Sequence, residues 1–129
     1  MFGRFRRFVT DIRLAAGASR LMRKAYALEA QRRYAEAIEV LKHVRAMVEQ
    51  PDPSLASVGV RASTRLTAAT LLSTIAARTG DRTLALDAIE EGLRLWTEVK
   101  PHVRQGTTLE RLNEWEAWAR RYVAATAGE

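Results

Sequence analysis

Apolar residues recur every three or four positions along the chain, and no stretch alternates polar and apolar residues as a half-buried strand does. This spacing predicts amphipathic helices. Glycine and proline interrupt it at Gly17-Ala18-Ser19, Pro51-Asp52-Pro53, Gly80-Asp81 and Lys100-Pro101 to Gly106. We therefore predict an all-α protein of about six helices, folded as a single helical domain over residues 1–129.

The breaks place the expected helices. The link Gln31-Arg32-Arg33-Tyr34 is so short that the helices on either side must form an antiparallel hairpin. Gly80-Asp81 predicts a second tight turn. Ser19 and Ser54 are candidate N-caps. The expected arrangement is an N-terminal helix (1–17), hairpin 1 (19–50), hairpin 2 (54–99) and a capping helix (107–125), with Trp96, Trp115 and Trp118 mainly in the core.

The two expected hairpins share a pattern of small and large residues. Each has a small residue in its first helix, a polar turn, a small residue early in its second helix and a larger apolar residue four positions later. Small residues let two helices approach to about 8–10 Å, and larger ones fill the groove beside them. The matching positions are Ala25 and Ser73, Arg32-Arg33-Tyr34 and Gly80-Asp81-Arg82, Ala37 and Ala85, and Leu41 and Ile89.

In this pattern, residues 19–50 and 66–99 resemble the tetratricopeptide repeat. Tyr34 and Arg82, at equivalent places in the two turns, are 48 residues apart, whereas the regular motif repeats every 34 or so. The resemblance therefore implies two degenerate hairpins and no smooth superhelix. Because two repeats alone are marginally stable, the first and last helices are expected to cap them.

The resemblance also implies a binding surface. In this family the first helices of successive repeats line a concave groove that binds extended or helical peptides. Carried onto this chain, the groove would be lined by Met22, Tyr26, Glu29, Thr67, Thr70, Thr74 and Arg78. An alternative is that the chain's own N-terminal helix fills the groove, with Phe5 and Phe8 against Met22 and Tyr26.

Charge distinguishes the N-terminal quarter from the rest. In residues 1–33, nine Lys and Arg stand against Asp11 and Glu29, so the net charge of +6 originates there. The expected first helix has an apolar face with phenylalanines, and Arg4, Arg6, Arg7 and Arg13 lie outside it. Such a helix could attach to an anionic membrane surface, contact nucleic-acid phosphates, dock into another protein or a second copy, or pack on its own bundle.

Catalytic chemistry has little support. The chain has no cysteine, which excludes a disulfide, a thiolate zinc site and a cysteine nucleophile. His43 and His102 belong to no recognisable ligand cluster, and no glycine-rich phosphate loop is present. The longest uncharged apolar run, residues 66–77, is shorter than the roughly 20 residues of a membrane span. We therefore expect a cytoplasmic protein that is not an enzyme and has no cofactor or metal.

These observations lead to one functional expectation and one rival. The expectation is a non-catalytic interaction or scaffold module that binds a peptide or helix of a partner protein, or that self-associates as a homodimer. The rival is a peripheral adaptor that attaches to an anionic membrane surface or nucleic acid through Arg4, Arg6, Arg7 and Arg13.

Overall fold

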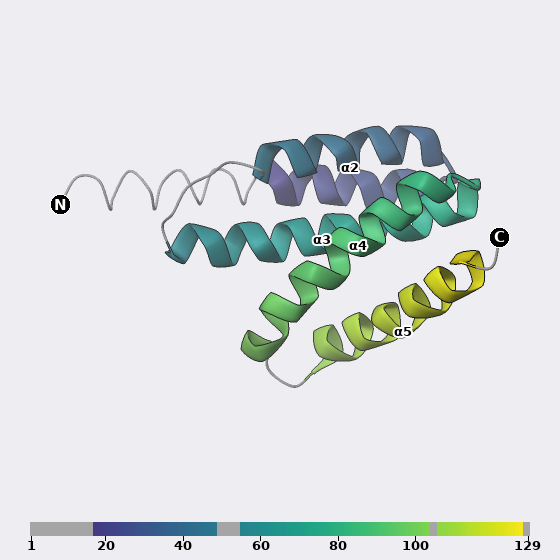
Figure 1. Cartoon of the computed structure of the whole chain (residues 1–129). Coiled ribbons are helices and arrows are strands. Elements are labelled where there is room, and N and C mark those ends of the chain that lie inside the picture. The colour runs from purple at the N-terminus through teal and green to yellow at the C-terminus, as the bar shows by residue number, and fades with distance from the viewer. Residues whose placement is uncertain (1–16, 49–54, 104–105, 128–129) are drawn as a thin grey trace.

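The computed structural model describes residues 17–48, 55–103 and 106–127 (Figure 1). Every regular element in these ranges is helical, which confirms the all-α prediction for this part of the chain. The helix expected at residues 1–17 lies almost wholly outside it. The elements are a helix over residues 17–30, α2 (Tyr34–Val48), α3 (Leu55–Thr79), α4 (Arg82–Val99), the short 3-10 helix η1 (Lys100–His102) and α5 (Thr107–Ala127).

The turn after helix 17–30 ends that helix with paired backbone hydrogen bonds. The N–H of Arg33 donates to the carbonyl of Leu28, and the N–H of Arg32 donates to that of Glu29, both at 2.9 Å. This pairing is the Schellman motif, in which the residue after the helix takes a left-handed conformation. Arg32 occupies that position with φ 59°. The turn is therefore closed by backbone geometry without the glycine that usually provides it.

The turn after α3 repeats this geometry with a glycine. Asp81 N–H donates to the carbonyl of Ala76 at 3.0 Å, and Gly80 N–H donates to that of Ala77 at 3.3 Å. Gly80 has φ 80°. Asp81 then begins the next helix, because its Oδ1 accepts the backbone N–H of Leu84 at 3.1 Å. One residue thus closes α3 and caps α4, which fixes the joint between them.

The N-terminal boundary expected at Ser19 is wrong. Gly17, Ala18 and Ser19 are already helical, and Ala18 is 1% exposed. A Cβ at Gly17 would lie 3.3 Å from Cε of Met47, so this end of the helix runs close to α2. Gly17 therefore lies within the helix and permits its close packing against α2.

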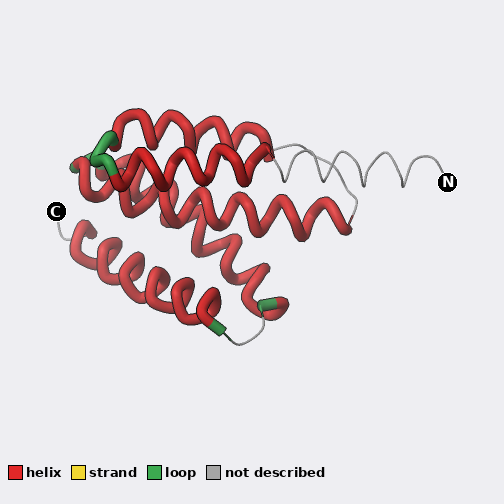
Figure 2. The backbone as a smooth tube through the Cα atoms, turned by 180° about the vertical axis from the view of Figure 1, so that it is seen from behind, coloured by secondary structure: helices red, strands yellow, loops and turns green. Residues whose placement is uncertain are grey.

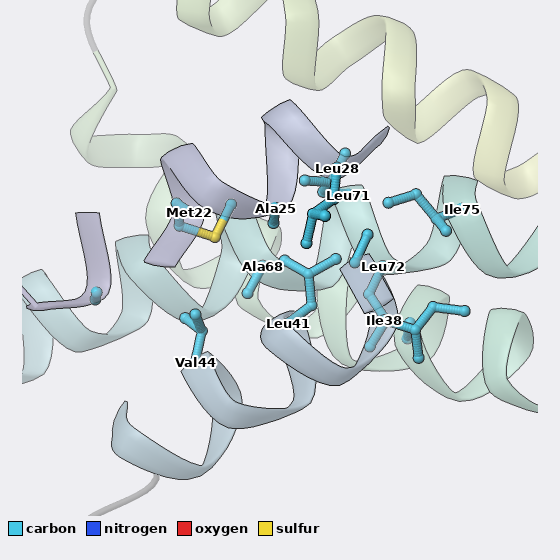
Figure 3. Packing of buried hydrophobic residues seen from close by; sticks show 13 residues of the cluster. Met22, Ala25, Leu28, Ile38, Leu41, Val44, Ala68, Leu71, Leu72 and Ile75 are labelled. Carbon is cyan, nitrogen blue, oxygen red and sulfur yellow. The ribbon is translucent and has the colours of Figure 1, made fainter. Parts of the chain in front are cut away.

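The main core lies between helix 17–30, α2, α3 and α4 (Figure 3). Met22, Leu28, Leu41 and Leu72 belong to it, together with small residues such as Ala25. Figure 2 shows α5 turning back from the end of α4. Two smaller clusters hold α5 in place. They are centred on Leu66, Leu95 and Trp96, and on Ile89, Trp115 and Ala119. The packing of α5 therefore depends on fewer buried side chains.

No helix in the described part of the chain combines the length and apolar character needed to cross a bilayer.

Candidate binding groove

A groove runs between α3 and α5, and helix 17–30 contributes Tyr26 to its lining. Its first part is a hollow of about 290 Å³. Tyr26 comes from helix 17–30, Thr70 and Thr74 from α3, and Arg111 and Trp115 from α5. The remaining lining residues are Thr67, Leu71 and Leu112. Segments far apart in the sequence thus form three walls of one hollow.

The second part is a wider hollow of about 520 Å³ between α3 and α5. Thr74, Arg111 and Trp115 line both hollows, so the two form one continuous groove. The second hollow adds two aromatic side chains, Trp118 and Tyr122, whose stacked rings have centroids 5.5 Å apart. Its remaining lining residues are Ala77, Arg78 and Glu114.

Trp115 fixes α5 against the rest of the bundle and so sets the width of the groove. Its Nε1–H donates to Oγ of the fully buried Ser73 at 3.0 Å. Its ring lies over Gly92 of α4, where a Cβ would come within 2.5 Å of Cη2. Gly92 is therefore required by close packing, because any side chain there would displace the indole.

The threonines of α3 present a polar wall with a defined hydrogen-bond preference. Thr70 Oγ1 donates to the carbonyl of Thr67 at 2.9 Å, and Thr74 Oγ1 donates to the carbonyl of Leu71 at 2.9 Å. A hydroxyl has one proton and two lone pairs, so both oxygens can still accept a hydrogen bond from a ligand. This wall therefore suits N–H donors such as those of a peptide backbone.

Tyr26 and Arg111 add further polar groups to the lining of the first hollow. Burial raises the pKa of Tyr26 above its ordinary value of 10.0, Glu29 raises it further, and Arg111 partly opposes them. The phenol is therefore protonated at neutral pH and able to donate. Its side chain is still accessible, because the residue is 48% exposed.

The seven residues expected to line a groove lie in three different places in the structure. Five of them, Tyr26, Thr67, Thr70, Thr74 and Arg78, line the groove described above. Glu29 lies beside Arg78 at a separate surface hollow with Ala30, Arg32 and Tyr34. Met22 lines none of these hollows; it is 7% exposed and belongs to the core. The basic residues Arg4, Arg6, Arg7 and Arg13 lie outside the described residues.

Sequence reasoning missed the wall formed by α5. Arg111, Leu112 and Trp115 line the first hollow, although the last helix was expected to act as a cap. A signal was present in the sequence, since Gly92 falls on the apolar face of α4. A glycine on an apolar helix face indicates close packing, but the sequence alone does not show that the side chain packed against Gly92 is Trp115.

A second polar cluster joins α2, α3 and α4 on another part of the surface. Arg45 forms an ion pair and a hydrogen bond with Glu91, and its Nη2 lies 3.4 Å from Oδ2 of Asp87. Arg65 Nη2 lies 3.5 Å from the other oxygen of Glu91. Burial lowers the pKa of Arg45, but the hydrogen bonds and charges of Glu91 and Asp87 outweigh it and raise that pKa overall. The charges are paired, so this cluster joins helices.

The described residues contain no group of three His, Asp or Glu side chains placed to hold a metal ion. His43 is exposed on α2.

Comparisons with protein-family models, with curated proteins and with solved structures find no match for this chain.

Proposed function

We propose that this protein is a non-catalytic interaction module that binds a peptide or a helix of a partner protein in the groove between helix 17–30, α3 and α5. The observation that carries the proposal is the groove itself, with two joined hollows of about 290 and 520 Å³. Its lining combines apolar and aromatic side chains with threonines, arginines and one carboxylate, as in sites that bind ligands specifically.

We further propose that helix 17–30 with α2, and α3 with α4, are degenerate tetratricopeptide hairpins. The support comes from the small residues at the expected crossings. Ala25, Ala37, Ser73 and Ala85 are each 0% exposed, as close helix packing requires. In this interpretation α5 stands where the first helix of a third repeat would stand, and the groove is the concave face.

The test is selection of ligands from a phage-displayed library of random peptides on the full-length protein. Selected peptides are then titrated by calorimetry against the wild type and against Thr74→Trp, which places an indole where the two hollows meet. We expect saturable binding to the wild type and loss of at least about tenfold in affinity for Thr74→Trp, because the occupied volume is no longer available.

Thr97→Trp is the matched control. Thr97 is an exposed helical threonine on α4 whose Oγ1 donates to the carbonyl of Leu93, as that of Thr74 does to Leu71. It lines neither hollow. Failure to select any peptide, or equal loss of binding in both variants, would contradict the proposal. Circular dichroism establishes that both variants fold.

The rival hypothesis, attachment to a membrane surface or nucleic acid through Arg4, Arg6, Arg7 and Arg13, stays a prediction. Its test is binding of the full chain to anionic vesicles and to duplex DNA at low and high salt, compared with a variant in which the four arginines are glutamine. Loss of salt-sensitive binding in the variant would support it.

A further inference from the structure

The first hollow of the groove contains one charged side chain. Arg111 is the charged residue among the eight that line it. Within the described part of the chain, Arg111 makes no ion pair or hydrogen bond. No described residue therefore occupies its five N–H donors, which lie in a planar arrangement that matches a carboxylate.

Groups next to Arg111 add to the match with a carboxylate-bearing ligand. Tyr26 interacts electrostatically with Arg111, and its phenol has no hydrogen-bond partner among the described residues. A carboxylate next to Arg111 can therefore accept from the guanidinium, and the phenol of Tyr26 offers a further donor in the same hollow. From α3, the oxygens of Thr70 and Thr74 can accept peptide N–H groups.

The second hollow differs in charge. Arg78 and Arg111 face it, and so does Glu114. It therefore offers both signs of charge next to the aromatic pair Trp118 and Tyr122. An apolar or aromatic side chain suits this hollow better than an ion does. An anion suits the first hollow better, because Arg111 is the charged residue of its lining and no carboxylate lines it; Glu29 acts on Tyr26 from outside the lining.

On these grounds we propose that the groove recognises an acidic peptide of a partner protein, with an Asp or Glu side chain bound by Arg111 in the first hollow and an adjacent apolar side chain in the second. This inference rests on the proposed function and specifies its ligand.

Charge also argues against the chain's own N-terminal segment as the occupant. That segment carries Arg4, Arg6, Arg7 and Arg13 against Asp11. Placing it in the groove would bring arginines towards Arg111 and Arg78, which have no anionic partner among the described residues. Like charges brought together in a partly desolvated groove are unfavourable.

The test compares the composition of library peptides selected on three full-length proteins: the wild type, Arg111→Gln and Arg121→Gln. Arg121 is the matched control, because it is an exposed arginine on the same helix and lines neither hollow. We expect enrichment of Asp and Glu over the unselected library on the wild type and on Arg121→Gln. We expect that enrichment to disappear on Arg111→Gln.

Calorimetry then measures the effect on one selected peptide. Replacing its conserved acidic residue with the amide is expected to weaken binding to the wild type by about tenfold, the loss of one charge-assisted hydrogen-bond pair. The same replacement is expected to leave the affinity for Arg111→Gln unchanged. A synthetic peptide of residues 1–16 is expected to bind the wild type more weakly than the acidic peptide.

The outcomes separate the two proposals. The groove function stands if peptides are selected and Thr74→Trp abolishes their binding. The acidic preference is nevertheless overturned if those peptides are not enriched in Asp and Glu, or if peptides selected on Arg111→Gln are equally enriched. Tighter binding of the peptide of residues 1–16 would also overturn the acidic preference. If no peptide of any composition is selected, both proposals fail.

Discussion

Arg32 and Gly80 occupy the same backbone position in two different turns. Each follows the last turn of a helix in the left-handed region, with φ 59° and 80° respectively. Glycine adopts this region without strain, whereas a residue with a Cβ is disfavoured by about 1–2 kcal/mol. The side chain of Arg32 makes no ion pair or hydrogen bond within the described residues that would offset this cost. The first turn is therefore the more strained of the two.

Arg32→Gly is expected to raise the free energy of unfolding by about 0.5–1 kcal/mol, since relief of the left-handed strain exceeds the entropy that glycine adds to the unfolded chain. The reciprocal change, Gly80→Ala, is expected to lower it by about 1 kcal/mol, although nothing lies within 4 Å of the new Cβ. Urea unfolding followed by circular dichroism measures both. A loss of stability in Arg32→Gly would show that Arg32 makes a compensating contact.

Gly92→Ala is expected to lower the free energy of unfolding by about 1–2 kcal/mol, because the new Cβ would lie 2.5 Å from Cη2 of Trp115. In a Trp115→Leu background the clash is absent. There the same change is expected to stabilise by up to about 1 kcal/mol, since alanine favours helix over glycine. Thermal unfolding of the four proteins gives the comparison. The same sign of effect in both backgrounds would contradict the assigned contact.

At the scale of elements, α2, α3 and α4 are held together by apolar packing and by the ion pairs around Glu91. Glu91 accepts from Arg45 of α2 and lies near Arg65 of α3, and its side chain is 11% exposed. The pair Arg33 and Glu36 in α2 is different, because both side chains are more than half exposed. Solvent screens an exposed pair, whereas a largely buried carboxylate depends on its partners.

Arg45→Met is expected to destabilise the protein by about 1–3 kcal/mol, because it removes the main partner of a largely buried carboxylate. Arg33→Met is the exposed control and is expected to cost less than about 1 kcal/mol. The double variant Arg45→Met with Glu91→Met is expected to recover part of the loss. Chemical denaturation measures these differences. A double variant less stable than Arg45→Met alone would contradict this interpretation.

The sequence predicts elements better than it predicts contacts between them. The tight turn expected at Gly80-Asp81 lies between α3 and α4, and α4 ends at Val99 just before Pro101, because both breaks are strong local signals. Ser19 misled because a small polar residue two positions after a glycine is ambiguous until its packing is known. The structure brings Thr67, Thr70 and Thr74 together at the groove because their spacing of three and four residues places them on one face of α3. The wall from α5 was missed because it depends on Trp115 meeting Gly92 and Ser73.

At the scale of the molecule, the described helices divide into a larger packed body and a more lightly held α5. The main cluster joins helix 17–30, α2, α3 and α4, whereas α5 joins through two small clusters. Asp81 fixes the joint between α3 and α4 by serving both helices. The groove lies along the boundary between this body and α5. Its width can therefore change by movement of one helix.

Trp115→Phe is expected to increase amide hydrogen exchange in α5 by about tenfold, since it removes the hydrogen bond to Ser73 and part of the ring contact. Exchange in α3 and α4 is expected to change little. Hydrogen exchange followed by mass spectrometry resolves the helices. A uniform increase along the chain would contradict the view that α5 opens separately.

The fluorescence of the three tryptophans can report whether the groove is occupied. Trp115 and Trp118 line the second hollow, and Trp96 is 1% exposed and lines neither hollow. A ligand that displaces water from the groove will shift the emission of Trp118 to shorter wavelength and leave that of Trp96 in place. Occupancy can thus be followed in the unlabelled protein as a shift of the total tryptophan emission, to which the buried Trp96 contributes a constant part.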